Sequence, residues 1–185
     1  MIAPKIELKK LGFTTLLPNA GEFYEKLDDN RARLDPWFWW MSRKTTPNFP
    51  RTILFAALYI LDTKRKKIMS KVYDEQFLFF NNGKFAGMGG LDNIDHIKKN
   101  AEIWGFVLKG NEWNGASAAG LKILTDYAFD AKGLDSVYAK TSTDNLQSEK
   151  FMRHNNFSVQ KIERGVPTSA RNPKITDLTT WEKVR

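Results

Sequence analysis

Hydrophobic and polar positions change period several times along the chain, most clearly between residues 101 and 157. An apolar run at 103–108 is followed by a polar turn with glycine at both ends, 110–115. Apolar residues then recur at a helical spacing, which predicts one helix face made of Ala118, Leu121, Leu124 and Ala128. A run rich in β-formers at 136–142 precedes a short helix capped by Asp144, with Gln147 at the capping-box position. This stretch predicts strand, turn, helix, strand, helix.

The rest of the chain adds strands and helices on both sides of this stretch. We expect strands at 6–11, 13–17, 76–80, 84–91, 157–162 and 175–184. A helix opens at Asn19, carries an apolar face and ends before Pro36, and another begins at Pro50. The succession predicts a single domain, 1–185, of the α/β (α+β) class, with a mostly antiparallel mixed sheet of about six or seven strands flanked by helices.

Glycines mark two special places in this pattern. Asn81-Asn82-Gly83 lies between two predicted strands and is typical of a hairpin turn. Gly87, Gly89 and Gly90 lie within the strand that follows, where such a density indicates a bulge or a close backbone approach.

Composition excludes several classes of chemistry. The 185 residues contain no cysteine and two histidines, so we expect no disulfide, no thiol nucleophile and no metal site. No apolar run reaches the roughly 18 residues of a membrane span, and the first residues lack a signal-peptide pattern. We therefore expect a cytoplasmic protein without a membrane partner.

The net charge of +8 favours acidic partners such as nucleic acid, a phosphate-bearing cofactor or an acidic protein. Five positive charges lie in Lys64-Arg65-Lys66-Lys67 and Lys71, which is also typical of a solvated helix end. The cluster alone does not predict a nucleic-acid binder.

The turn at 110–115 predicts an anion site. It offers no obvious Ser, Thr or Asp cap for the helix that follows. The first N–H groups of that helix are left without partners, and together with the helix dipole they attract negative charge.

Several segments in joint register resemble the GNAT acyltransferase superfamily, and more narrowly its RimJ/RimL type of ribosomal-protein N-acetyltransferase. The matching residues are Ala101-Glu102-Ile103, Tyr127-Ala128-Phe129-Asp130, Gly133-Leu134, Asp144-Asn145, Ser148 and Phe157. The segment from Asp29 to Trp40, DNRARLDPWFWW, resembles an N-terminal motif of the same group. The resemblance implies a GNAT fold and acetyl-CoA as cofactor.

The pyrophosphate turn departs from the family pattern. Glu112 stands where the superfamily has Gln or Arg, and Ser117 stands at the last small position. A carboxylate beside a pyrophosphate is unfavourable, so the resemblance requires Glu112 to point away into solvent. Asn156 also replaces the glycine that normally precedes the phenylalanine, here Phe157.

The resemblance implies which residues hold the cofactor. The pyrophosphate would lie on the turn and the first helical residues, and the pantetheine arm would run beside the preceding strand through main-chain hydrogen bonds. The implied cofactor-binding residues are Phe106, Val107, Leu108, Asn114, Gly115, Ala116, Ser117, Ala118 and Asn145.

Two residues are our candidates for acid–base chemistry, because the amine must lose a proton and the thiolate must gain one. Glu102 is the candidate base, directly or through water; its alternative role is to pair with a lysine. Ser148 matches a serine that RimL-like enzymes place near the sulfur; its alternative role is that of a helix-surface serine. The tyrosine that other GNAT enzymes use here falls at Met152, which cannot donate.

The acceptor implied is an amine. A weak base serves an α-amine, which titrates at about pH 7.7–8.0, better than a lysine at about 10.4. The resemblance implies the N-terminus of a ribosomal protein or, alternatively, a small aminoacyl-nucleotide or antibiotic, as in the acetyltransferase domain for microcin C self-immunity. Aromatic residues that could stack on such an acceptor are Trp37, Trp39, Trp40, Trp104 and Trp113.

Two further points stay open. Four adjacent aromatics, 37–40, cannot all face inward on a regular element, so they line a pocket or pack between helices. A module that kept the fold, lost the chemistry and binds nucleic acid is the other class of protein, although we do not expect a nucleic-acid partner. The resemblance allows a homodimer.

Overall fold

The computed structural model describes residues 5–16, 18, 20–34, 61, 74–112, 115–167 and 175–185. Predictions that fall outside these residues concern the Asn19 cap, the helix from Pro50, the basic cluster 64–71, the aromatics at 37–40, and Trp113 with Asn114. The chain divides into two compact units, Met1–Gly90 with Gly105–Leu121 and Leu91–Trp104 with Lys122–Arg185.

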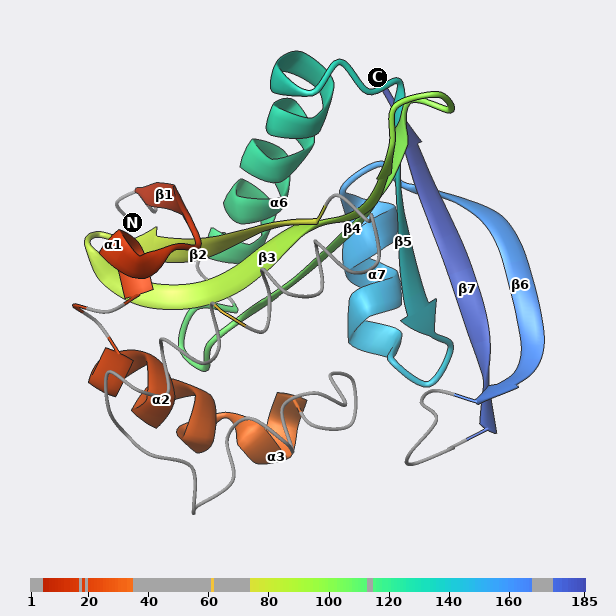
Figure 1. Cartoon of the computed structure of the whole chain (residues 1–185). Helices are drawn as coiled ribbons and strands as arrows, with labels where there is room; N and C mark the ends of the chain where they lie inside the picture. The colour runs from red at the N-terminus through yellow and green to blue at the C-terminus, as the bar shows by residue number, and fades with distance from the viewer. Residues whose placement is uncertain are drawn as a thin grey trace. The chain divides into compact units, whose positions relative to one another are not determined.

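Seven strands form one mixed sheet, and hydrogen-bonded neighbours follow the order β1-β2-β3-β4-β5-β7-β6 (Figure 1). The strands are β1 Ile6–Lys10, β2 Glu75–Asn81, β3 Lys84–Asp95, β4 Asn100–Val107, β5 Ser136–Ser142, β6 Ser158–Pro167 and β7 Ile175–Val184. The described helices are α1 Phe13–Leu16, α2 Ala20–Asp29, α3 Arg31–Leu34, α6 Ala116–Asp126, the π-helical turn η2 Tyr127–Ala131, and α7 Leu146–His154. The predicted fold class and strand number are confirmed.

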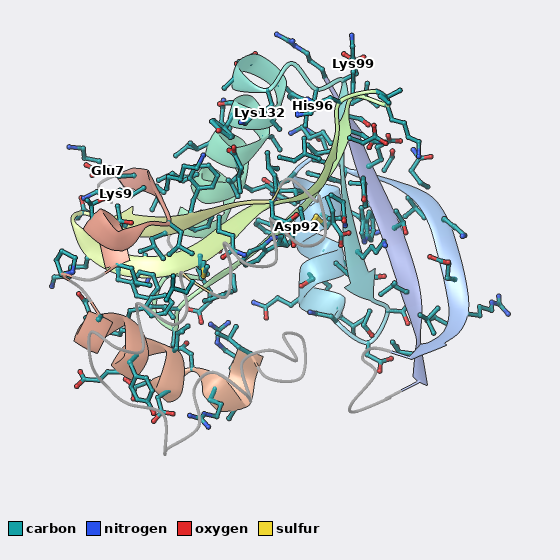
Figure 2. The ribbon with its side chains drawn as sticks, viewed as in Figure 1. Glu7, Lys9, Asp92, His96, Lys99 and Lys132 are labelled. Atoms are coloured by element: carbon teal, nitrogen blue, oxygen red, sulfur yellow. The ribbon has the colours of Figure 1, made fainter. Side chains whose placement is uncertain are left out.

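The first unit is built on the β1–β2 pair and the β2–β3 hairpin. Strands β1 and β2 are antiparallel. The Nζ of Lys9, which is labelled in Figure 2, lies 4.7 Å from the centre of the Phe80 ring. The predicted hairpin turn is confirmed, because Asn82 and Gly83 have φ angles of 50° and 78°, as a type I′ turn requires. Phe23 of α2 packs on Phe85 of β3 with ring centroids 5.2 Å apart, which places the N-terminal helices against this part of the sheet.

The predicted strand at 13–17 is wrong, since this segment begins with the helical turn α1. The Thr15 hydroxyl accepts from the Gly12 N–H at 3.0 Å and donates to the Lys10 carbonyl at 2.8 Å. The Leu16 N–H donates to the Gly12 carbonyl at 2.9 Å. Such local side-chain bonds to the backbone compete with strand pairing, and the apolar pattern alone does not reveal them.

The predicted helix from 19 to 35 is interrupted at Asn30, which separates α2 from α3. Its predicted apolar face is nevertheless correct, because Phe23, Tyr24, Leu27 and Leu34 are buried.

Two glycines of the first unit allow close packing. A Cβ on Gly87 would lie 2.3 Å from the Phe106 carbonyl oxygen, so β3 and β4 approach closely there, as the glycine density indicates. A Cβ on Gly120 would lie 3.0 Å from the ring of Phe79, so α6 packs against β2 at this point.

The buried face of α6 differs from the prediction at one residue. Leu121, Leu124 and Ala128 are buried as expected, but Ala118 is exposed. Ala116 is buried instead. Ala118 is about 200° around the helix from Ala116, so it cannot share that face.

The second unit contains the parallel pair of the sheet. Asn100, Ala101 and Glu102 of β4 pair with Ser136, Val137 and Tyr138 of β5. Strand β7 then pairs antiparallel with β5 and with β6. Trp181 of β7 is fully buried and donates from Nε1 to the Thr141 hydroxyl at 2.7 Å, which fixes the centre of this unit.

Candidate functional site

Glu102 stands at the end of the parallel ladder between β4 and β5. Its register partner Tyr138 belongs to the last of the three residue pairs. In the part of the chain that the structure describes, the next residue, Ile103, therefore has no register partner in β5. Strand edges that are not paired offer N–H and C=O groups to an extended ligand.

Two side chains hold the carboxylate of Glu102. Asn93 donates from Nδ2 to Oε2 at 3.2 Å, and the Lys140 Nζ lies 3.9 Å from the same oxygen. The side chain of Glu102 is 23% exposed, so water can still reach it and carry a proton to the carboxylate. The lysine pairing considered for this residue is present, and it leaves the second oxygen, Oε1, free of that pair.

Tyr138 faces the same group. Burial raises the pKa of the Tyr138 hydroxyl, the negative charge of Glu102 raises it further, and a hydrogen bond with Asn93 opposes the shift. The charges of Asp92 (labelled in Figure 2) and Asp95 also raise it. The phenol thus keeps its proton at neutral pH and can donate a hydrogen bond.

Sequence reasoning missed Asn93, Tyr138 and Lys140. A signal existed for two of them, since residues two apart on a strand share a face and 136–142 was predicted as a strand. Nothing in the sequence indicated that Asn93, with its left-handed φ of 53°, would reach Glu102.

Ser148 and Asn145 are brought together at the start of α7. The Oδ1 atom of Asn145 accepts from the Ser148 N–H at 3.1 Å, so Asn145 is the N-cap. The predicted cap, Asp144 with Gln147, is therefore wrong by one residue. The cap fixes the first turn of α7 and with it the half-buried Ser148.

The turn before α6 has the features of an anion site. Gly115 has a φ of 80°, and no acidic residue lies in the first turn of the helix. Ala116 is buried, Ser117 is partly exposed and Ala118 is exposed. Small side chains at these positions let an anion approach the start of the helix, which suits a pyrophosphate.

The backbone groups of Phe106, Val107 and Leu108, which we predicted to bind the cofactor, are not equally available at the end of β4. The Leu108 N–H donates to the Ala86 carbonyl at 2.7 Å, so it is already used by β3. Backbone groups alternate between the two edges of a strand, which directs those of Val107 to the opposite edge. The Val107 carbonyl accepts a hydrogen bond from Arg33.

Glu112 does not point into solvent, which corrects the requirement stated from the sequence. Its Oε2 accepts from the Gly110 N–H at 2.6 Å, and its Oε1 lies 3.7 Å from Arg33 Nη1. The side chain is 14% exposed. The carboxylate is folded onto the turn and its charge is paired.

Of the aromatic residues predicted to stack on the acceptor, the structure describes Trp104. The others lie outside the described residues: Trp37, Trp39, Trp40 and Trp113. Trp104 is partly exposed and follows Glu102 by two positions, so the two side chains share a face of β4. No group of three or more potential metal ligands occurs in the described residues. None of the described helices is long and apolar enough to cross a membrane.

Comparison with known proteins assigns this arrangement to a family. Residues 21–158 match the model of the acetyltransferase (GNAT) domain. The chain therefore belongs to the GNAT family and is an acetyl-CoA-dependent N-acetyltransferase. No curated protein matches the sequence.

Solved structures share the fold at low identity. The microcin C7 self-immunity acetyltransferase MccE, in complex with acetyl-CoA and AMP, has a TM-score of 0.78 at 16% identity, over 98% of this chain and 93% of that chain. RimL, a ribosomal L7/L12 α-N-protein acetyltransferase in complex with coenzyme A, has a TM-score of 0.77 at 16% identity, over 97% of this chain and 93% of that chain. The spermidine N-acetyltransferase from Vibrio cholerae has a TM-score of 0.67 at 16% identity, over 97% of this chain and 93% of that chain.

Proposed function

We propose that this enzyme acetylates an α-amino group, and that the acceptor is the N-terminus of a protein. The observation that carries the proposal is the position of Glu102, where the β4–β5 ladder ends opposite Tyr138. A carboxylate held there by Asn93 and Lys140 is a weak base beside an unpaired strand edge.

The strength of the base supports an α-amine over a lysine. An α-amine at about pKa 7.7–8.0 is partly neutral at physiological pH, whereas a lysine at about 10.4 is almost entirely protonated. The carboxylate of Glu102, which is paired with Lys140, would therefore remove a proton far more readily from an α-ammonium group than from a lysine ammonium group.

The residues of the turn and of β4 suit acetyl-CoA. The proposed pyrophosphate site is the N–H groups of Gly115, Ala116, Ser117 and Ala118; α6 has no acidic residue in its first turn. The proposed pantetheine partner is the edge of β4 at Val107. Phe106 and Leu108 contribute side chains only, because the Leu108 N–H is bonded to Ala86 and the backbone groups of Phe106 face the same edge. The cofactor, when bound, supplies the acetyl group as a thioester.

The chain's own residues would move two protons. Glu102 would accept a proton from the acceptor's ammonium group, directly or through a water molecule, so that the neutral amine can attack the thioester; the second proton, which the nitrogen sheds as the amide forms, would pass to solvent. Tyr138, whose raised pKa keeps it protonated, can donate a hydrogen bond within the same group. Ser148 donates a proton to the sulfur as the carbon–sulfur bond breaks, and regains one from solvent.

Charge supports an acidic acceptor protein. The chain carries a net charge of +8, which attracts an acidic partner over long distance. Near the proposed base, the negative charges of Glu102, Asp92 and Asp95 all raise the pKa of Tyr138, so these carboxylates make the electrostatic potential there more negative. An acidic protein would be attracted by the net positive charge of the enzyme, and its positively charged N-terminus would be attracted by the carboxylates near Tyr138.

An acetyl-transfer screen followed by mass spectrometry tests the proposal. The acceptors are an acidic peptide with a free N-terminus, the same peptide with a blocked N-terminus and one internal lysine, spermidine, and a non-hydrolysable aminoacyl-adenylate analogue. We expect the highest kcat/KM for the free N-terminus, by about tenfold or more over the lysine peptide.

Other outcomes replace parts of the proposal. A higher kcat/KM for the adenylate analogue makes the acceptor a small molecule, as self-immunity or antibiotic resistance would require. A higher value for spermidine or for the lysine peptide overturns the α-amine specificity.

A further inference from the structure

Arg33 on α3 contacts two places that are far away in sequence, the end of β4 and the turn before α6. Its guanidinium donates to the Val107 carbonyl at the end of β4, and Nη1 lies 3.7 Å from Glu112 Oε1. The side chain is 40% exposed, so part of the cation faces solvent. All these residues belong to the same compact unit.

Asn30 holds Arg33 in this position. It is 5% exposed and donates from Nδ2 to the Lys26 carbonyl at 2.8 Å. Its Oδ1 accepts from Arg33 Nη2 at 3.1 Å and from the Lys109 N–H at 2.8 Å. One buried amide therefore holds both the guanidinium of Arg33 and Lys109, the residue just before the turn.

Glu112 creates an electrostatic problem that this arrangement resolves. The carboxylate lies three residues before Gly115, on the turn that we propose binds a pyrophosphate. An unpaired carboxylate there would repel the phosphates. Glu112 is fixed by the Gly110 N–H, so it cannot swing away without breaking that bond.

We propose that Arg33 is a cofactor-positioning residue: it neutralises Glu112 and supplies the positive charge that the turn itself lacks for the phosphates of acetyl-CoA. This inference rests on the proposed pyrophosphate site. Arginine suits the role, because its planar group can hold the carboxylate and the Val107 carbonyl while other N–H groups remain available to an anion.

Calorimetry with acetyl-CoA and with acetyl-pantetheine, which lacks the phosphates, tests the proposal. Arg33→Ala should raise the Kd of acetyl-CoA about tenfold and leave that of acetyl-pantetheine within about twofold. The double variant Arg33→Ala/Glu112→Gln should recover part of the lost affinity, since the unpaired carboxylate is gone but the positive charge of Arg33 is still missing. Glu112→Gln alone should bind acetyl-CoA at least as tightly as the wild type.

Arg31→Ala is the matched control. It removes the same charge from the same helix, but Arg31 pairs with Asp28 rather than with the turn. We expect an acetyl-CoA Kd within about twofold of the wild type, since the charge of Arg31 is already paired with Asp28.

Three results would overturn the role of Arg33. They are an unchanged acetyl-CoA Kd in Arg33→Ala, an equal loss for acetyl-CoA and acetyl-pantetheine without rescue by Glu112→Gln, and weaker acetyl-CoA binding by Glu112→Gln itself. The single Glu112→Gln variant keeps the test valid if Arg33→Ala does not fold. A wild-type protein that binds no acetyl-CoA would instead refute the proposed pyrophosphate site.

Discussion

At the scale of single residues, Ser148 shows how a backbone bond and a side-chain role can be separated. Its N–H completes the cap of α7 by donating to Asn145, and its hydroxyl is the proposed proton donor. Replacement by alanine keeps the N–H and removes only the hydroxyl.

Ser148→Ala should therefore lower kcat by about 10²-fold while the Kd of acetyl-CoA and the melting temperature stay close to the wild type. Steady-state kinetics, calorimetry and thermal unfolding measure the three quantities. Gln147→Ala, at the exposed neighbouring position, is the control and should keep full activity. Unchanged turnover in Ser148→Ala would remove this residue from the mechanism.

Asn156 explains one departure from the family pattern. It stands where the family has glycine, and its φ of 62° lies in the left-handed region. Asparagine tolerates that region better than most residues, so the turn after α7 keeps its shape without glycine. The substitution therefore gives no reason to expect a loss of function.

At the scale of elements, the contact between β3 and β4 is governed by Gly87. A Cβ at this position would lie 2.3 Å from the Phe106 carbonyl oxygen and 2.8 Å from the Val107 Cα. Backbone atoms cannot yield as a flexible side chain can, so the strands would have to separate.

Gly87→Ala should lower the free energy of unfolding by about 1–3 kcal/mol, as overpacking does. The matched control is Gly21→Ala in α2, where a Cβ would meet nothing within 4 Å. That variant should be stabilised by up to about 1 kcal/mol, because alanine favours a helix more than glycine does. Urea denaturation compares the two, and equal stabilities would contradict the close approach.

At the scale of the whole molecule, the net charge of +8 should control the encounter with the acceptor. Raising the ionic strength from about 0.01 M to about 0.15 M shortens the screening length from about 30 Å to about 8 Å. Attraction between a basic enzyme and an acidic protein then weakens.

The KM of an acidic peptide acceptor should therefore rise several-fold over this range of salt, whereas the KM of a neutral peptide with the same N-terminal residue should change little. Initial rates at fixed, saturating acetyl-CoA measure both. An identical salt response of the two peptides would show that net charge does not guide the acceptor.

Sequence by itself determined the order of most elements and the family. The strands at 76–80, 84–91 and 136–142, the face of α2, and the register of Glu102 and Ser148 with the GNAT pattern all follow from local periods and spacings. Such signals are local, because a residue's place on a strand or helix repeats every few positions. Local signals failed where a side chain bonded to the backbone of a residue nearby in sequence, as Thr15 does with Lys10 and Asn145 with Ser148.

Tertiary structure alone decided what the charged residues do. The sequence led us to expect Glu112 in solvent, and only the structure pairs it with Arg33, one of 29 lysines and arginines in the chain. In the same way Glu102 acquired Asn93 and Lys140 as partners. These contacts join segments that are distant in sequence, and the energy of an ion pair or hydrogen bond depends on separations that only the folded chain defines.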